Sequence, residues 1–366
     1  MNNLKDLSYL RMAYALAEKA KGWASPNPYV GTVLIRKDVI VGYGYHEGPG
    51  KPHAEIIALQ RAGSLAKKST AFITLEPCVH WGRTPPCVER IIQAGLKRIV
   101  ISDLDANPLV HKKGIKKIRE AGIEVSLGLL KERNRALNEC YLKYITQKTP
   151  FVTAKAAVSL DGKIATKKFS SQWISSAPAR EYAHLLRGEF DALMIGVNTL
   201  LKDDPRLTVR HPNWKNKRIT RIILDTHLRF PLKARVLSTL NKGKIIVFTL
   251  KTASQRKAEA LRRKGVEVVP VRSASCFIDL KEVLAWLGKS GVSSLLVEGG
   301  GRLMTSMFEK NLIDKVFFSV SPILIGGNKA PSLFGGEGID LIKDTLRLKR
   351  TNYFQINEDR FLEGYL

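Results

Sequence analysis

Four side chains in the N-terminal part of this 366-residue chain have the types and the spacing of a catalytic zinc site. His53 and Glu55 stand two residues apart at the start of a helical pattern, and Cys78 and Cys87 flank a loop rich in proline and glycine. Zinc accepts histidine nitrogen and cysteine thiolate as ligands, and three protein ligands leave a fourth position for water. We therefore predict that His53, Cys78 and Cys87 bind one Zn²⁺ per chain at a catalytic site.

Glu55 is predicted to be the catalytic acid and base of this site. Because it follows His53 by two residues, its carboxylate can face the open position without binding the metal. Zinc lowers the pKa of a bound water to about 7, and a carboxylate beside it can take up and return the proton. The alternative is a structural zinc knuckle, which needs a fourth ligand; His46 and His80 are the candidates nearby.

Strands and helices alternate along both halves, which is typical of α/β domains. In the first half we expect helices over 5–20, 53–62, 86–94, 112–121 and 130–145, a hairpin that turns at Lys37–Asp38, and a largely parallel sheet. The second half starts a new strand near Phe151, and 315–327 is expected to be a strand. We predict one domain over 1–147 and another over 148–366.

The net charge of +27 raises the question of nucleic-acid binding. Residues 1–150 carry +11 and the remainder +16, so no basic arm or single basic domain stands out. An evenly spread positive charge suits an anionic, phosphorylated small-molecule substrate, and we predict no nucleic-acid partner. No apolar stretch is long enough to span a membrane, and the N-terminus lacks the pattern of a signal peptide. The predicted location is the cytoplasm, and Cys140 and Cys276 are expected to be buried, inert thiols.

The zinc motif also carries a family resemblance. The segments HAE and TLEPCVHWGRTPPC (74–87) resemble the deaminase half of the bifunctional riboflavin biosynthesis deaminase–reductases. Base deaminases commonly place two residues between their cysteines, whereas this family has the longer spacing seen here. The resemblance continues through SPNPYVG (25–31) and DANPLVHKKGI (105–115), in which Ala106 departs from the usual proline.

This resemblance implies a cytidine-deaminase-like three-layer α/β/α domain in which Asn27 and Asn107 bind substrate. Taken by itself, Asn27 between two prolines is either a turn residue or a base-binding amide. Asp103 and Asp105 are interpreted as caps at the end of a strand and are left out of the site. The reaction implied is the hydrolytic deamination of 2,5-diamino-6-(5-phosphoribosylamino)pyrimidin-4(3H)-one to 5-amino-6-(5-phosphoribosylamino)uracil.

The second half lacks the G-x-G-x-x-G fingerprint of dinucleotide-binding domains but contains VEGGGRL (297–303), a strand that runs into a glycine-rich helix start. Backbone N–H groups at such a turn can bind phosphate. Before it come AKAAVSLDGKIA (154–165), SSQWIS (170–175), ARxxxHxLR (179–187) and IGVNTLLKDDPRLTVR (195–210). In this order the segments are similar to the reductase half of the same family, which has a dihydrofolate-reductase-like α/β fold and uses NADPH.

The resemblance implies two sets of binding residues in this half. The NADPH-binding positions are Ala157, Trp173, Thr199, Asp203, Gly300, Gly301, Arg302, Leu303, Met304, Thr305 and Ser306. The substrate-binding positions are Ser171, Arg187, Leu207, Arg210 and Glu298. The two arginines suit the phosphate of the substrate because guanidinium binds phosphate oxygens as a fork. Lys155 and Asp203 are both candidate proton donors, and the sequence does not choose between them.

The function predicted from the sequence is therefore bifunctional: zinc-dependent deamination followed by NADPH-dependent reduction of the ribosyl group to the ribityl phosphate. A homo-oligomer, dimer or tetramer, is the expected assembly. A tRNA or nucleotide deaminase is the rival enzyme, but it leaves the second half unexplained. A nucleic-acid-binding protein with an inactive deaminase fold is the other rival, and the intact set of His53, Glu55, Cys78 and Cys87 argues against it.

Overall fold

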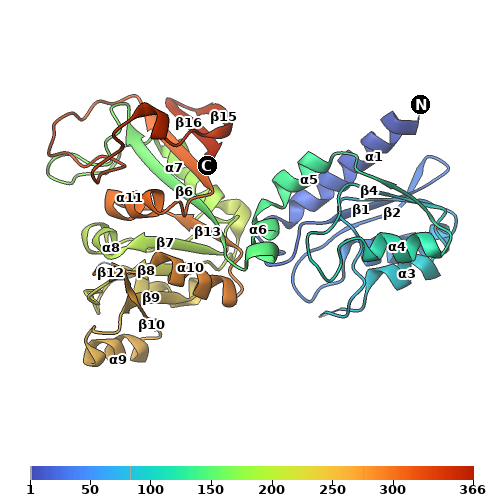
Figure 1. Ribbon diagram of the computed structural model, residues 1–366, viewed down its shortest axis with the longest axis horizontal. Coiled ribbons are helices and arrows are strands. Elements are labelled where there is room, and N and C mark those ends of the chain that lie inside the picture. Colours follow the sequence, from blue (N-terminus) through green and yellow to red (C-terminus); the bar gives the residue numbers. More distant parts are fainter. Residues whose placement is uncertain (1, 83, 275) are drawn as a thin grey trace. The chain divides into compact units, whose positions relative to one another are not determined.

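Two compact units make up the chain (Figure 1). The computed structural model describes residues 2–82, 84–274 and 276–366. The units are Met1–Lys148 and Thr149–Leu366, and each has its own sheet and its own core. Among the described residues, no helix is both long and apolar enough to cross a bilayer.

The first unit is built on a five-stranded sheet in the order β2-β1-β3-β4-β5. The sheet is mixed, not largely parallel as predicted, because β1 pairs antiparallel with both β2 and β3, and only β3–β4 and β4–β5 are parallel. The expected turn at Lys37–Asp38 is confirmed, and both residues have positive φ. The elements are α1 (Asn2–Ala17), β1 (Gly31–Arg36), β2 (Val39–Tyr45), α2 (Ala54–Ala62), β3 (Thr70–Ile73), α3 (Cys87–Gln93), β4 (Arg98–Ile101), α4 (Lys113–Glu120), β5 (Glu124–Leu127), α5 (Lys131–Leu137) and α6 (Glu139–Gln147).

Helices cover both faces of this sheet, which gives the predicted three layers. Alternate residues of a strand point to opposite faces, and in β1 Val33 packs with Leu10 of α1 while Leu34 packs with Ala58 of α2. The α2 side also receives α3 and α4, through residues such as Ile91 and Ile118. Because consecutive residues of these short strands are apolar and point to opposite faces, one sheet supports helices on both of its faces.

Glycines let α2 lie unusually close to strand β2. A Cβ atom at Gly42 would stand 2.2 Å from the Ala58 carbonyl oxygen, and one at Gly44 would stand 2.6 Å from that of Ala54. Any side chain at either position would push the helix away. Because His53 and Glu55 stand at the start of α2, these two glycines help to set the depth of both residues.

The second unit contains a nine-stranded sheet in the order β10-β9-β8-β7-β13-β6-β14-β16-β15. It is parallel from β10 to β14, and the C-terminal strands β16 and β15 add antiparallel. The elements are β6 (Phe151–Ser159), α7 (Ala177–Arg187), β7 (Ala192–Gly196), α8 (Val197–Asp203), β8 (Thr220–Leu224), β9 (Ile245–Leu250), α9 (Gln255–Arg263), β10 (Glu267–Val271), β11 (Ser273–Ala274), β12 (Phe277–Ile278), α10 (Leu280–Lys289), β13 (Ser294–Val297), α11 (Gly301–Glu309), β14 (Lys315–Ser321), β15 (Lys349–Ile356) and β16 (Asp359–Tyr365).

Two large apolar clusters hold the layers of this unit together. One joins α10 and α11 to the sheet, and the other joins α8 and α9 to it. The parallel strands are buried over nearly their whole length, as expected for strands covered on both faces. Their carboxyl ends therefore lie at one edge, where the chain places Gly196, Glu298 and the start of α11.

Three local predictions were wrong. The helix expected over 130–145 is interrupted at Asn138, whose buried side chain accepts a hydrogen bond from the Tyr29 N–H (2.7 Å) and donates one to the Tyr29 carbonyl (3.2 Å). The strand expected over 315–327 ends at Ser321. Cys276 is exposed and Cys140 is only half-buried. In the first case, a contact between residues far apart in the sequence interrupts a helix that the local pattern predicts to be continuous.

Candidate active sites

Three predicted zinc ligands converge in the first unit. His53 immediately precedes α2, Cys78 follows β3, and Cys87 is the first residue of α3. The His53 Nδ1 atom lies 3.1 Å from the Cys87 Sγ and 3.5 Å from the Cys78 Sγ. The ligand atoms of the three residues all lie within 4.8 Å of one another. One nitrogen and two sulfurs at this separation fit the donor set that zinc prefers.

Electrostatics favours the ligand form of Cys78. Hydrogen bonding with Cys87 and with His53 lowers its pKa, although burial opposes the shift. The Cys87 backbone N–H also points at the Cys78 Sγ, 3.4 Å away. Because the thiolate is the form that binds metals, this environment prepares Cys78 for coordination.

Glu55 is buried beside the ligands without belonging to the set of three. Burial raises the pKa of its carboxyl to about 7, while the nearby His53 opposes the shift. A general acid and base works best when its pKa lies near the working pH. Glu55 is therefore suited to move protons at neutral pH.

A cavity of about 270 Å³ adjoins these groups, although the buried Cys87 is not among its lining residues. Asn27, Asn107, His53, Glu55 and Cys78 line it, so the structure brings together residues predicted from four separate segments. Its remaining lining residues are Pro26, Pro28, Val30, His46, Gly50, Leu75, Glu76, His80, Gly82, Thr84, Asp105, Val110 and Tyr141.

Hydrogen bonds orient the Asn27 amide. The His46 Nδ1 lies 3.2 Å from the Pro52 carbonyl, which can only accept, so Nδ1 carries the hydrogen. The His46 Nε2 must then accept from the Asn27 Nδ2, at 2.9 Å. Asn27 is thereby held with its amide nitrogen engaged, and its oxygen remains as an acceptor for a ligand. His46 thus serves to orient Asn27 and does not belong to the group of metal ligands.

Sequence reasoning missed the residues that hold the opposite wall. Asp105, interpreted as a strand-end cap, lines the cavity and accepts hydrogen bonds from the Asn107 N–H (2.8 Å) and the Tyr141 hydroxyl (2.7 Å). Glu76 is buried, and its carboxylate accepts from four backbone N–H groups, those of 105, 112, 114 and 115, at 3.0–3.3 Å. In the sequence, Glu76 stands between a buried strand and Pro77-Cys78, and this position was the one signal of its structural role.

His80 lies in the same cavity but not among the metal ligands. Its Nδ1 is buried and makes no hydrogen bond among the described residues. The group of possible ligands found in residues 2–82, 84–274 and 276–366 contains His53, Cys78 and Cys87 and neither His46 nor His80. The geometry thus matches a three-ligand site with an open position rather than a closed zinc knuckle.

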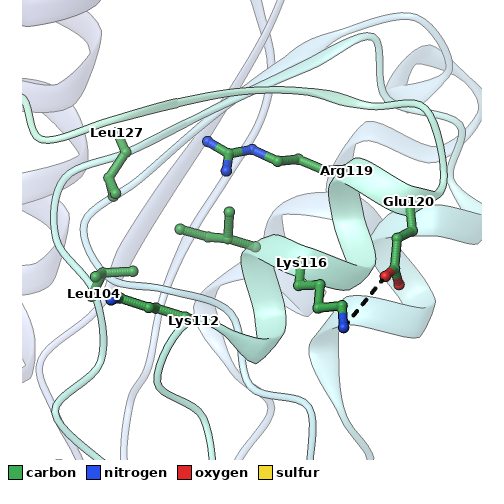
Figure 2. A pocket seen from close by; sticks show the side chains of 7 residues that line it. Leu104, Lys112, Lys116, Arg119, Glu120 and Leu127 are labelled. Carbon is green, nitrogen blue, oxygen red and sulfur yellow. Dashed lines mark ion pairs between the residues drawn. The ribbon is translucent and has the colours of Figure 1, made fainter.

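A second hollow in this unit contains none of the predicted site residues. It has a volume of about 350 Å³ and lies between α4 and the edge strand β5. Figure 2 shows its basic rim, in which Lys116 pairs with Glu120 at 3.9 Å. Its lining residues are Leu104, Lys112, Ile115, Lys116, Arg119, Glu120 and Leu127. Its lining contains no sulfur or imidazole group, whereas the cavity around His53 contains both.

The second unit brings the predicted substrate residues together as a chain of charges. Arg187 ends α7 and forms a two-bond ion pair with Glu298, with Nε–Oε1 at 2.9 Å and Nη2–Oε2 at 2.6 Å. Both side chains are largely buried. Burial opposes ionisation of Glu298, yet Arg187 and Lys155 lower its pKa to about 2. Burial lowers the pKa of Lys155, while Glu298 raises it.

The fork of Arg187 is therefore already occupied. Only its Nη1 is directed elsewhere, towards the Thr208 carbonyl (3.4 Å) and the His184 ring (3.3 Å). Arg210, by contrast, is exposed and makes hydrogen bonds to the Thr208 hydroxyl (3.2 Å) and the His184 ring (2.8 Å). The two arginines expected to share one role thus have different surroundings.

The predicted cofactor residues surround the start of α11. The Gly300 N–H donates to the Thr199 hydroxyl at 3.2 Å, and Gly299 has a φ of 116°, which permits the sharp turn before the helix. Leu303 and Met304 are core residues, so only their backbones are available to a cofactor. Arg302 is exposed, Thr305 accepts a hydrogen bond from the Gly335 N–H, and Gly301 and Ser306 are half-buried.

The remaining predicted positions lie on other segments of this unit. Ala157 on β6 is half-buried, as is Ser171, and Asp203 is exposed at the end of α8. Trp173 is 66% exposed and carries the Arg180 guanidinium 4.3 Å from its ring centre, so it is not a core residue. Leu207 is buried in the core with positive φ, which leaves only its backbone for contact with substrate.

Comparison with known proteins identifies both halves. The sequence profile of the RibD C-terminal domain matches residues 150–362, and that of the cytidine and deoxycytidylate deaminase zinc-binding region matches residues 4–103. The riboflavin biosynthesis protein RibD of Aquifex aeolicus is 44% identical, covering 97% of this chain and 96% of its own. The chain belongs to the RibD family. The Escherichia coli member is 34% identical over 94% of this chain and 95% of its own.

Solved structures of RibD proteins have the same fold. A structure of Acinetobacter baumannii RibD matches with a TM-score of 0.88 at 33% identity, covering 98% of both chains. A diaminohydroxyphosphoribosylaminopyrimidine deaminase/5-amino-6-(5-phosphoribosylamino)uracil reductase from Thermotoga maritima matches with a TM-score of 0.87 at 32% identity, covering 100% of this chain and 99% of the other.

These matches confirm the predicted fold class, a cytidine-deaminase-like domain followed by a dihydrofolate-reductase-like domain. They also confirm the predicted function class, a bifunctional deaminase and reductase of riboflavin biosynthesis that acts on a small molecule. Its cofactors are those of a zinc-binding deaminase and an NADPH-dependent reductase. The roles of individual residues rest on the geometry described above.

Proposed function

We propose that the first unit deaminates 2,5-diamino-6-(5-phosphoribosylamino)pyrimidin-4(3H)-one at the His53–Cys78–Cys87 site. The observation that carries this proposal is the convergence of three zinc donors, two of which line the same cavity as the buried Glu55, in a RibD-family chain. A zinc ion held by these three residues would act as a Lewis acid that makes water nucleophilic at neutral pH.

The chain's own residues then manage the protons and the base. Glu55 accepts the proton of the attacking water, returns it to the ring nitrogen and carries a further proton to the departing ammonia. The oxygen of Asn27, left as an acceptor by the bond to His46, suits the N–H groups of an aminopyrimidine. Asn107 faces the same cavity, and Asp105 holds its backbone in place.

For the second unit we propose reduction of the ribosyl group. NADPH bound at the Gly300–Ser306 turn with Ala157, Trp173, Thr199 and Asp203 would supply a hydride to C1′ of the sugar. Ser171, Arg187, Arg210, Glu298 and the backbone of Leu207 bind the substrate. Lys155 gives its proton to the ring oxygen as the C1′–O bond opens. Its burial beside Glu298 favours it over Asp203, whose pKa is also shifted, upwards by partial burial, but whose side chain is exposed.

Substrate comparison tests the proposal against the rival nucleic-acid deaminase. Ammonia release should be measured with the diaminopyrimidine ribotide and, separately, with an RNA oligonucleotide, together with the zinc content of the protein. We expect zinc near one per chain and release from the ribotide alone. Release from the oligonucleotide at a comparable rate would contradict the proposed substrate.

We further propose that the enzyme is a cytoplasmic homo-oligomer, a dimer or a tetramer, in which β15 takes part in the interface. This strand ends the nine-stranded sheet and pairs with β16 on one side. Leu341, Ile342, Leu346 and Tyr353 are exposed on or before it. An edge strand with apolar neighbours favours association with another chain. Light scattering should show a larger molar mass for the wild type than for Tyr353→Lys. A monomer mass for both proteins would contradict this assembly.

A further inference from the structure

His184 connects the two arginines of the reductase site. It lies on α7 three residues before Arg187, so the two side chains share one face of the helix. The His184 Nδ1 lies 3.3 Å from the Arg187 Nη1, and its Nε2 lies 2.8 Å from the Arg210 Nη2. No step of the reduction described above uses this histidine.

The charges around His184 keep its ring neutral. Burial first, and then the Arg187 and Arg210 guanidinium groups, lower the pKa of His184 to about 3. Lys155 acts in the same direction, and Glu298 opposes the shift. These are the charged groups that face the ring. At neutral pH, His184 therefore has one N–H donor and one acceptor nitrogen.

A guanidinium can only donate, so the two contacts of His184 cannot be equivalent. The shorter one, at 2.8 Å, identifies Nε2 as the acceptor from Arg210. The Nδ1 atom then carries the hydrogen and faces Nη1 of Arg187, another donor, at 3.3 Å. With this tautomer, an oxyanion beside the two nitrogens could accept a hydrogen bond from each, although Nη1 also has the Thr208 carbonyl 3.4 Å away.

We propose that His184 is a positioning residue of the phosphate site: its Nε2 fixes the direction of Arg210, and its Nδ1–H joins Arg187 Nη1 in facing the phosphate of the substrate. The inference rests on the proposed function, in which both arginines bind that phosphate. Because Glu298 occupies the fork of Arg187, recognition depends strongly on Arg210. Arg210 is an exposed side chain, and its two side-chain partners are the Thr208 hydroxyl and His184.

Replacements that remove different nitrogens separate the two roles of the ring. His184→Phe keeps a ring but no hydrogen-bonding atom, whereas His184→Gln can place an acceptor near the former Nε2. With the phosphorylated aminouracil substrate and saturating NADPH, we expect KM to rise roughly ten- to hundredfold in His184→Phe, as for a lost charged hydrogen bond. His184→Gln should recover part of this loss, and kcat should change little in both variants.

The dephosphorylated substrate is the decisive control. Its KM should be the same in His184→Phe as in wild type, because the affected group is missing from the ligand. His227→Gln, an exposed histidine of the same unit, should leave both KM values unchanged. An unchanged kcat at saturating substrate reports that the second unit of each variant is folded, and deamination reports the same for the first unit. An unchanged KM for the phosphorylated substrate in both His184 variants, or an equal rise with both substrates, would overturn the proposal.

A double-mutant cycle distinguishes this inference from the function on which it rests. If His184 acts through Arg210, adding His184→Phe to Arg210→Ala should raise KM much less than it does in wild type. If Arg210→Ala itself penalises both substrates equally, the assignment of the phosphate site is wrong. The remaining outcome is that Arg210→Ala raises KM only for the phosphorylated substrate, while adding His184→Phe raises that KM by the same factor as it does in wild type. In that case only the role of His184 is wrong.

Discussion

The two active sites differ in how their residues hold one another. In the first unit the ligand atoms of His53, Cys78 and Cys87 lie within 4.8 Å of one another, and each residue would supply one ligand atom. In the second unit, an extended chain of interacting groups contains four charged side chains and the neutral ring of His184, in the order Lys155, Glu298, Arg187, His184 and Arg210. Loss of one residue should therefore abolish the activity of the first site, whereas it should only reduce the activity of the second.

Cys78→Ser should have the largest effect. A serine hydroxyl stays protonated at neutral pH and is a poor zinc ligand, so zinc should fall from one per chain towards none and deamination should be lost. Metal analysis and ammonia release measure this. Cys276→Ser, an exposed cysteine outside the ligand group, is the matched control and should keep both. Unchanged zinc in Cys78→Ser would remove Cys78 from the site.

Lys155→Met should have the next largest effect, confined to the second unit. Loss of a proton donor typically costs about 10²–10⁴-fold in rate, so NADPH oxidation with the aminouracil substrate should fall by that factor. Ammonia release should stay at the wild-type level. The comparison with Asp203→Asn decides between the two candidates that the sequence left open. A greater loss in Asp203→Asn would transfer the role to Asp203.

Glu298→Gln should produce a graded loss of stability that depends on pH. Removing one partner of a buried ion pair costs about 3–5 kcal/mol, and we expect the lower end because both side chains keep some exposure. The pKa of Glu298 falls from an ordinary 4.5 to about 2 on folding. Its contribution is therefore complete above pH 4.5 and is lost as the pH falls towards 2.

Denaturant unfolding from pH 3 to pH 8 measures this difference. The difference in unfolding free energy between wild type and Glu298→Gln should be constant from about pH 5 to 8 and should shrink below pH 4.5. A gap that widens on acidification would contradict the ion pair with Arg187. Glu181→Gln, an exposed glutamate on α7, is the control and should show little effect at any pH.

Glu76→Gln should have the smallest effect. The amide keeps one acceptor oxygen but turns an NH₂ group towards backbone donors, at a cost of about 1–3 kcal/mol in unfolding free energy. The segment with Asp105 and Asn107 loses part of its support, so KM for deamination should rise modestly while the zinc content stays constant. Glu120→Gln, on the surface of α4, should stay within about 0.5 kcal/mol of wild type. Equal stability of wild type and Glu76→Gln would remove the role assigned to this carboxylate.

Residue types and their order predicted α/β domains and the composition of the zinc site, while the cytidine-deaminase-like and dihydrofolate-reductase-like folds followed from the family resemblance. Short apolar runs marked the buried strands, and His53, Cys78 and Cys87 had the types and spacing of zinc ligands, with His46 and His80 as alternatives nearby. The interrupted helix at Asn138 escaped prediction because its cause is a bond to Tyr29, 109 residues away. The contact of Asp105 with Tyr141 escaped prediction for a similar reason, because Tyr141 lies on a distant helix.

In the second unit, the sequence could not reveal how charges share their partners. Arg187 and Arg210 look equivalent in the motif, yet Glu298 occupies the fork of the first and leaves the second exposed. His184 stood inside a recognised segment and was not assigned, since only the folded chain brings Arg210 to its ring. Local patterns thus identify residues, while pairing across the fold decides their roles.

The central claim is that two independent sites on one chain carry out successive reactions, and Glu55→Gln tests it most directly. Wild type and the variant should each be given the diaminopyrimidine and, separately, the aminouracil, while ammonia, NADPH oxidation and bound zinc are recorded. We predict that Glu55→Gln keeps its zinc and reduces the aminouracil at the wild-type rate. Its ammonia release should be slower by about 10²–10⁴-fold or more. Ammonia release near the wild-type rate, or equal loss of both activities in a folded, zinc-loaded variant, would contradict the account.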